Sequence, residues 1–205
     1  MSNVPDNTRP DQMSESQVVH WFDFICPFCY VSQNRDAFAV ARGLEVLDLP
    51  FRAHPEIPPT GVHVGPRVGP MYRDIEAQAR ASGLALDWPF RIPNSGTALG
   101  AAEWVRRNYR TVAREFNSTL FEAHFVLNED IGDKATVLRK AAQLGLDAGM
   151  LDQALADGRA TAWVRESESI AEHHGVRGTP AWLYQGRLLT GAGSMEEFSR
   201  FIDAT

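Results

Sequence analysis

Residues 17–30 decide the fold and read QVVHWFDFICPFCY. Residues 17–25 form a short apolar run rich in Val, Phe and Trp, which is long enough for a strand and too short for a helix. The two cysteines of the chain, Cys26 and Cys29, follow directly. Pro27 suits the first turn of a helix, because the N–H that proline lacks has no intrahelical partner there. The pattern therefore predicts a Cys-x-x-Cys motif where a strand ends and a helix begins.

The chain after the motif predicts a strand–helix–strand unit. The helix is expected to end at Gly43, since glycine is the common residue just past a helix C-terminus. Residues 44–53 predict a second strand, in which the apolar residues Leu47, Leu49 and Phe51 recur at every second position. Pro50 cannot donate to a ladder, so this strand is expected at a sheet edge. The order strand, helix, strand implies a parallel pair with a right-handed crossover.

A large and mainly helical stretch follows. Residues 55–70 contain five Pro and three Gly and predict a loop. Between Ala98 and Ala123 apolar side chains recur at every third or fourth position, which indicates one long helix or two helices that break near Asn108. Shorter helices are expected over residues 71–82, 134–144, 148–156 and 159–174.

The end of the chain changes its periodicity again. Residues 181–184 and 187–190 are strand-like and are separated by Gln185 and Gly186, which predicts a hairpin. Ser194 is followed three residues later by a glutamate, a capping-box pattern that opens a last helix. The complete order is βαβ, a helical stretch, and ββα.

Composition excludes several classes of protein. The chain has 205 residues, 44% hydrophobic and 22% charged, with a formal net charge of -6, so it can bury a core without disulfide staples. There is no basic surplus to neutralise phosphates, which disfavours nucleic acid as a partner. No apolar run is long enough for a membrane span. Residues 1–16 are expected to form a flexible polar tail, and because they lack the apolar core of a secretory signal, we expect a cytoplasmic location.

The spacing of the two cysteines indicates disulfide exchange. A helix N-terminus favours the thiolate at Cys26, and Cys29 lies close enough to attack a mixed disulfide formed there. Cys26 is therefore expected to be the more exposed thiol. A structural zinc site is disfavoured, because none of the six histidines forms a second ligand pair with suitable spacing. Two unreactive core cysteines are disfavoured by the proline between them.

The segments CPFCY at 26–30 and HGVRGTPAWLYQGRLLTGA at 174–192 carry a family resemblance. Together with the helical stretch between them, they resemble the DsbA-like branch of the thioredoxin superfamily. The chain is most similar there to FrnE-type dithiol oxidoreductases, which are related to 2-hydroxychromene-2-carboxylate isomerases and kappa-class glutathione transferases. The resemblance implies an α/β thioredoxin-like fold (βαβ…ββα) built from residues 17–57 and 158–205, with a large inserted helical domain at residues 58–157.

The resemblance also assigns roles within the site. Cys26 is then the nucleophile and Cys29 the resolving thiol, and the proline of the Gly-Thr-Pro turn is cis and stands against the motif. Backbone groups of the turn would pair with an extended substrate chain. The residues expected to contact substrate are Pro27, Phe28, Thr179 and Pro180.

The function predicted on these grounds is that of a thiol–disulfide oxidoreductase, of protein disulfide oxidoreductase or isomerase type. The alternative is a glutathione-dependent isomerase or transferase acting on a small aromatic compound. Relatives with that activity carry serine at the first motif position, where this chain has Cys26. A third reading is a binding module whose thiols are incidental.

The expected substrate is a disulfide-containing protein or a small thiol, with no nucleic acid or membrane partner. No metal and no resident cofactor are expected beyond the dithiol, with glutathione as a conceivable co-substrate. Monomer and homodimer both stay open.

Four further residues around the motif have candidate roles. Phe28 stands where DsbA-like oxidants often carry a histidine, so Cys26 is expected to be less acidic, and the couple more reducing, than in strong oxidants. His20 and Asp23 are candidates for taking the proton of the second thiol, although a core histidine with satisfied contacts is the simpler interpretation of His20. Arg177 is a candidate for adding positive potential beside the motif.

Overall fold

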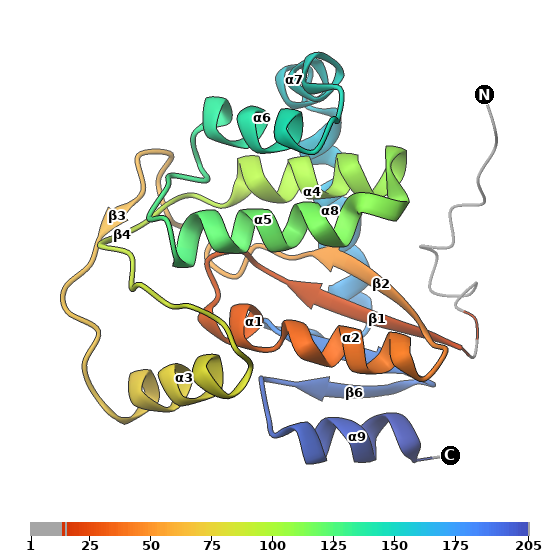
Figure 1. Ribbon diagram of the computed structural model, residues 1–205. Helices are drawn as coiled ribbons and strands as arrows, with labels where there is room; N and C mark the ends of the chain where they lie inside the picture. Colours follow the sequence, from red (N-terminus) through yellow and green to blue (C-terminus); the bar gives the residue numbers. More distant parts are fainter. Residues whose placement is uncertain (1–13, 15, 205) are drawn as a thin grey trace.

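A four-stranded sheet forms the centre of the computed structural model, which describes Ser14 and residues 16–204 (Figure 1). The strands are β1 (Gln17–Phe22), β2 (Glu45–Pro50), β5 (Ala181–Tyr184) and β6 (Arg187–Thr190), in the order β2-β1-β5-β6. The pair β1–β2 is parallel, and the pairs β1–β5 and β5–β6 are antiparallel. The predicted strand–helix–strand unit, the edge position of the strand that contains Pro50, and the hairpin are all confirmed. The expected tail lies almost entirely outside the described residues.

Helices cover both faces of this sheet. On one face, Val18 of β1 packs with α2 (Gln33–Ala41) and α9 (Met195–Asp203). On the other face, Val19 and Trp21 pack against Ala171 of α8 (Arg159–His173). Successive side chains of β1 thus enter opposite layers, and every residue of the strand is buried.

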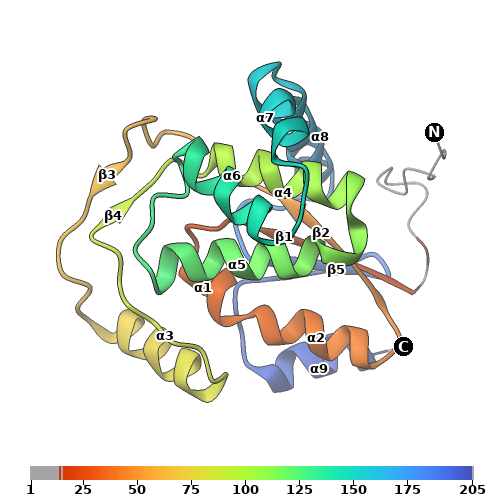
Figure 2. The same cartoon turned by 45° about the horizontal axis from the view of Figure 1, so that its top comes forward.

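The remaining long helices come from the stretch of chain between β2 and α8 (Figure 2). They are α3 (Pro70–Ala81), α4 (Gly96–Asn108), α5 (Ala113–Phe125), α6 (Lys134–Gln143) and α7 (Ala148–Ala156). Their buried side chains share one core with Cys29 and Tyr30 of the motif helix α1 (Pro27–Val31). The inserted helices are therefore packed directly on the motif. The domain boundaries remain a prediction, because α8 contacts both α4 and β2.

The helix ends follow the expected local signals. Gly43 and Gly175 lie just beyond α2 and α8 with φ of 79° and 74°, a conformation that glycine adopts without steric cost. The Ser194 hydroxyl accepts a hydrogen bond from the Glu197 N–H and completes the capping box. The long apolar stripe is two helices, since α4 ends at Asn108 and a short 3₁₀ turn at Arg110–Val112 precedes α5.

Two local expectations were wrong. The helix that follows the motif is broken at Ser32, whose hydroxyl donates to the Phe28 and Cys29 carbonyls at 2.6 and 3.2 Å and competes with the backbone ladder. The proline-rich loop contains a two-residue strand, β3 (Val62–His63), because it pairs with β4 (Arg91–Ile92), a partner remote in sequence.

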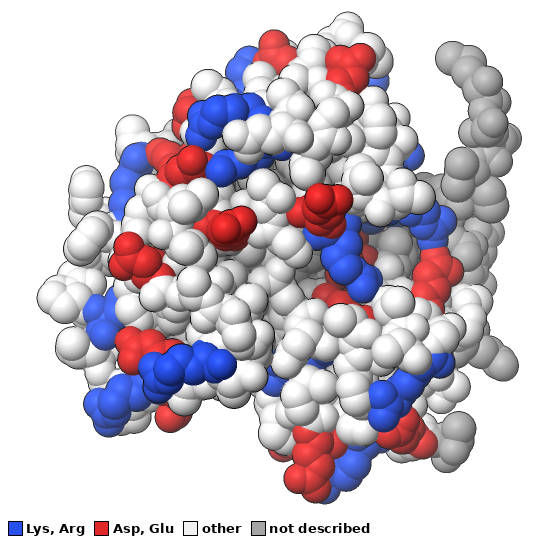
Figure 3. Space-filling model, viewed as in Figure 1, with Lys and Arg blue, Asp and Glu red and all other residues white. Residues whose placement is uncertain are grey.

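Acidic and basic side chains are interspersed on the face seen in Figure 3. None of the described helices combines the length and the apolarity that a bilayer crossing requires.

Candidate active site

Cys26 stands at the junction between β1 and α1. It is the N-cap residue of α1, with extended backbone angles (φ -83°, ψ 111°), and Pro27 occupies the first turn as predicted. The Cys26 carbonyl accepts hydrogen bonds from the N–H groups of Cys29 and Tyr30 at 3.1 and 3.2 Å. These hydrogen bonds form the first turn of α1 and place both cysteines just beyond the end of β1.

The turn before β5 faces the motif. The Thr179–Pro180 bond is cis, as the resemblance implied. Because β5 runs antiparallel to β1, with Ala181 opposite Trp21, the start of β5 lies at the end of β1 that leads to the motif. The Cys26 Sγ donates a hydrogen bond to the Thr179 carbonyl at 3.3 Å. The predicted juxtaposition of the turn and the first cysteine is therefore present.

The two thiols have different environments. The hydrogen bond from the Cys29 thiol outweighs burial and lowers the pKa of Cys26 to about 7. Burial raises the pKa of Cys29 above its ordinary value, and this side chain is fully buried. Cys26 is thus the more exposed of the two thiols, as predicted, and its pKa is the lower of the two. A pKa near 7 resembles that of thioredoxin (~7) more than that of a strong oxidant (~3.5).

Asp23 is the buried acid beneath the motif. Its carboxylate accepts hydrogen bonds from the backbone N–H groups of Ala53 at 2.8 Å and Ile25 at 3.3 Å. Burial nevertheless raises the pKa of Asp23 to about 6. Its charge raises the pKa of Cys26, and its backbone hydrogen-bonds to the Cys29 sulfur. Asp23 therefore combines closeness to both thiols with a pKa suited to proton transfer near neutral pH.

Replacing Asp23 with asparagine is expected to raise the free energy of unfolding, relative to the unmodified protein, by about 1–3 kcal/mol more at pH 8 than at pH 4. The pKa of this carboxyl is higher in the folded than in the unfolded chain, so its stabilising contribution is complete below the unfolded pKa and is lost as the pH rises through about 6. The Ile25 and Ala53 N–H groups donate to different carboxylate oxygens, so the amide keeps only one of these two hydrogen bonds, a loss that is the same at both pH values.

Urea unfolding at both pH values measures this effect, and Asp74→Asn, at an exposed position on α3, is the matched control. A variant that is destabilised equally at both pH values would show that ionised Asp23 carries no burial cost.

His20 belongs to a different cluster, which supports its interpretation as a core histidine. Its Nδ1 lies 2.9 Å from Asp36 Oδ2 and 3.0 Å from Asp48 Oδ1, and its ring stacks on Trp182 at a centroid distance of 4.8 Å. The pleat of β1 directs His20 toward α2, while the cysteines lie beyond the end of the strand. Among the described residues, its polar partners are these two carboxylates, so the structure favours Asp23 over His20 as proton acceptor.

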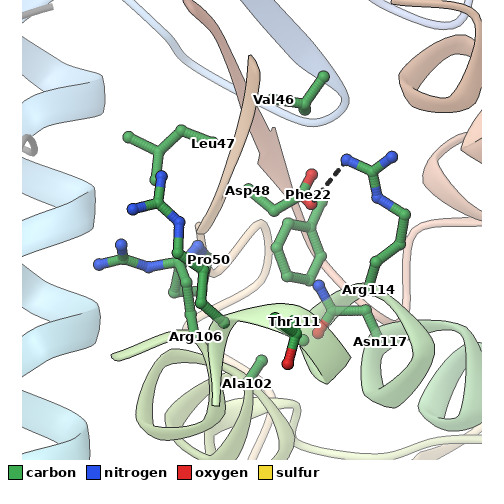
Figure 4. A pocket seen from close by; sticks show the side chains of 12 residues that line it. Phe22, Val46, Leu47, Asp48, Pro50, Ala102, Arg106, Thr111, Arg114 and Asn117 are labelled. Atoms are coloured by element: carbon green, nitrogen blue, oxygen red, sulfur yellow. Dashed lines mark ion pairs between the residues drawn. The ribbon is translucent and has the colours of Figure 1, made fainter. Parts of the chain in front are cut away.

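A cavity of about 290 Å³ opens beside this cluster (Figure 4). Figure 4 shows the Arg114 guanidinium directed at Asp48, an ion pair of 3.8 Å. His20, Asp36 and Asp48 bring three potential metal-ligand atoms within 4.8 Å of one another. His20 already forms ion pairs with both Asp36 and Asp48, so we assign no metal ion to this cluster. The expectation of a metal-free protein stays a prediction.

A second cavity, of about 450 Å³, is lined by Cys26 but not by Cys29. Three of the four predicted contact residues, Pro27, Phe28 and Thr179, line it, and so does Arg177. Pro180 is buried and does not belong to the lining. We refer to this space as the active-site cavity.

The opposite wall of the active-site cavity comes from the inserted helices and loops. It includes Arg67, Tyr72, Trp88, His124 and Phe125. Sequence analysis did not identify these residues as part of the site, since an aromatic or basic residue on a helical stretch carries no sign of the cavity that it will face. Only the packing of the insertion on the motif helix brings them there.

Comparisons with known proteins agree with this geometry. The family described as DSBA-like thioredoxin domain matches residues 17–203. The uncharacterized protein YwbO of Bacillus subtilis is 24% identical over 184 residues, covering 88% of this chain and 92% of the relative. A probable DsbA oxidoreductase from Streptomyces coelicolor has a TM-score of 0.76 and 25% identity, covering 92% of this chain and 88% of that one. A 2-hydroxychromene-2-carboxylate isomerase also has a TM-score of 0.76, with 18% identity and coverage of 92% and 95%.

Proposed function

The chain belongs to the family of DSBA-like thioredoxin domains, and we propose that it is a thiol–disulfide oxidoreductase of FrnE type that exchanges disulfides through Cys26. The observation that carries the proposal is the asymmetry of the dithiol. Cys26 is partly exposed, has a pKa of about 7 and contacts the Thr179 carbonyl, while Cys29 is fully buried behind it. One thiol is thus suited to attack an incoming disulfide and the other to resolve the product.

The reaction proceeds in two exchanges. The Cys26 thiolate attacks one sulfur of the substrate disulfide, the substrate S–S bond breaks, and one substrate sulfur leaves as a thiolate. Cys29 then loses its proton to the Asp23 carboxylate and attacks Cys26 Sγ, which releases the second substrate sulfur. The substrate gains two electrons, and the protein is left with a Cys26–Cys29 disulfide. The same steps in reverse oxidise a dithiol substrate.

The Thr179 backbone and the active-site cavity bind the substrate in this proposal. The Thr179 carbonyl accepts from the Cys26 thiol in the free protein and becomes available to a substrate N–H once Cys26 is ionised or bonded. The proposed substrates are disulfide-containing proteins or small thiol compounds. In a cytoplasmic location the reaction would run in the direction that reduces the substrate disulfide. The oligomeric state stays open.

The alternative function, a glutathione-dependent isomerase or transferase, is favoured by one observation. The active-site cavity is lined by the aromatic side chains of Phe28, Tyr72, Trp88 and Phe125, and its volume of about 450 Å³ suits a small aromatic compound. Isomerisation that survives the change Cys26→Ser would support this alternative, because that chemistry needs no sulfur at the first motif position.

The proposed function is tested by mixing the reduced protein with hydroxyethyl disulfide and counting the thiols released. Each chain is expected to release both halves of one disulfide and to form the Cys26–Cys29 bond. A chain that releases no thiol would contradict the proposal.

Alkylation of the reduced protein by iodoacetamide is expected to modify Cys26 first, with a rate that follows an apparent pKa of about 7. Cys29 should react only after unfolding, because it is fully buried. Mass spectrometry of the peptides at several pH values measures both rates. In Cys29→Ala the pKa of Cys26 should rise, since the hydrogen bond that lowers it most is removed. A faster Cys29 would reverse the two roles.

A further inference from the structure

Two polar side chains of the insertion line the active-site cavity together with Cys26. Arg67 comes from the loop before α3, and His124 comes from the last turn of α5. The two groups are close enough for the charge of Arg67 to act on the His124 ring. Neither residue has a part in the exchange mechanism described above.

Both side chains have unused hydrogen-bonding capacity. Among the described residues, the buried Arg67 Nε has no hydrogen-bond partner, while Nη1 donates to the Tyr72 hydroxyl at 3.4 Å and the guanidinium lies 5.7 Å from the centroid of the Tyr72 ring. His124 is 2% exposed, and its described contact is an edge-on packing against Phe125 at a centroid distance of 4.6 Å. In the described part of the chain, its ring nitrogens make no hydrogen bond. A buried donor without a partner is costly, so the unpaired Arg67 Nε beside a cavity points to a ligand that completes it.

The charge of the cavity defines the chemistry of that ligand. Among the residues that the structure describes, its lining contains the guanidinium groups of Arg67 and Arg177 and no aspartate or glutamate. The carboxylate of Asp130 also acts on His124, but it is paired with Arg91 at 2.6 Å. Burial and the charge of Arg67 lower the pKa of His124 to about 4, so at neutral pH its ring is uncharged and offers one N–H.

We propose that Arg67 and His124 form a carboxylate subsite in the active-site cavity, which holds an acidic group of the substrate while Cys26 attacks its disulfide. The guanidinium supplies the charge and its free Nε–H, and the imidazole supplies a neutral N–H donor. The inference rests on the proposed function, because it concerns the substrate of the same reaction. This subsite favours disulfides that carry a carboxylate near the sulfur over neutral and cationic disulfides.

The test compares three small disulfides of similar size, which are dithiodipropionate, hydroxyethyl disulfide and cystamine. The second-order rate constant of the reduced protein is measured with each, by the change in tryptophan fluorescence, and is divided by the rate constant of a free monothiol with the same disulfide. The normalised rate constants are expected to fall in the order anionic, neutral, cationic. A charge-assisted hydrogen bond is worth about a tenfold change in affinity or more.

Variants assign the preference to the two residues. Arg67→Gln and His124→Phe are each expected to reduce the ratio of anionic to neutral rate constants about tenfold. His124→Gln keeps an N–H donor and should retain more of the ratio than His124→Phe. Arg73→Gln is the matched control, since it removes the same charge from an exposed position on α3 outside the lining. Circular dichroism and thermal unfolding confirm that each variant is folded.

The outcomes separate this inference from the function on which it rests. If the protein reacts with none of the three disulfides, the proposed function fails. If it reacts with all three at equal normalised rates, or if Arg73→Gln lowers the ratio as much as Arg67→Gln, only the subsite is wrong. A pair of peptide disulfides with Glu or Gln next to the cysteine identifies the source of the carboxylate. A preference for the Glu peptide indicates a protein substrate, and a preference limited to dithiodipropionate indicates a small molecule.

Discussion

Replacing Cys26 with serine is expected to lower the rate of disulfide exchange roughly a thousandfold or more, to the background of the assay. Serine keeps the size of the side chain and its possible hydrogen bond to the Thr179 carbonyl, but its hydroxyl is not ionised at neutral pH and cannot form a mixed disulfide. The remaining thiol, Cys29, is fully buried with its pKa raised, so it does not replace the missing nucleophile. Stopped-flow measurement with hydroxyethyl disulfide gives the rate constant.

The matched variant Cys29→Ser is expected to behave differently. The first attack remains, but the mixed disulfide on Cys26 is no longer resolved from within the chain, so it accumulates. Mass spectrometry of the intact protein should show one substrate half attached per chain, released by a reducing agent. Comparable exchange rates in Cys26→Ser and the unmodified protein would refute the assignment of Cys26 as nucleophile.

Replacing His20 with alanine is expected to lower the free energy of unfolding by about 3–5 kcal/mol near neutral pH. The imidazole lies between the carboxylates of Asp36 and Asp48 and is 4% exposed. Its removal leaves two carboxylates close together in a buried site without their common cation, and it also removes the stacking on Trp182. Urea unfolding at pH 7 measures the loss. His173→Ala, at an exposed position near the end of α8, is the control and should change stability by less than about 0.5 kcal/mol.

The pH dependence of this loss has a definite sign. Burial alone would lower the pKa of His20, but Asp36 and Asp48 raise it to about 10. A histidine whose pKa is higher in the folded chain contributes stability that is complete below the unfolded value of 6.5, and this stability is lost as the pH rises through the folded value. The difference between the unmodified protein and His20→Ala should therefore shrink as the pH approaches 10. A constant difference from pH 6 to pH 10 would show that the charge of His20 does not hold the cluster.

The local features of this fold could be predicted from the sequence because neighbouring residues produce them. Pro27 and the apolar run before it are sufficient to place the motif between a strand and a helix, since φ of proline and the strand period are properties of a few adjacent residues. The same holds for Gly43 after α2 and for the capping box at Ser194. The family resemblance added the Thr179–Pro180 turn to the site, a contact with Cys26 across 153 positions that no local pattern reveals.

Tertiary structure alone decided which side chains share an environment. His20 and Asp23 are three residues apart and carry equally plausible chemistry in the sequence, yet the pleat of β1 sends His20 to the carboxylates of α2 and β2, and the end of the strand leaves Asp23 beneath the cysteines. Arg67 and His124 likewise enter the active-site cavity only because the insertion packs on the motif helix. Periodicity tells which face of an element is buried, but the partner against which it is buried depends on contacts between distant segments. The burial and the charges found there determine the pKa values of the site.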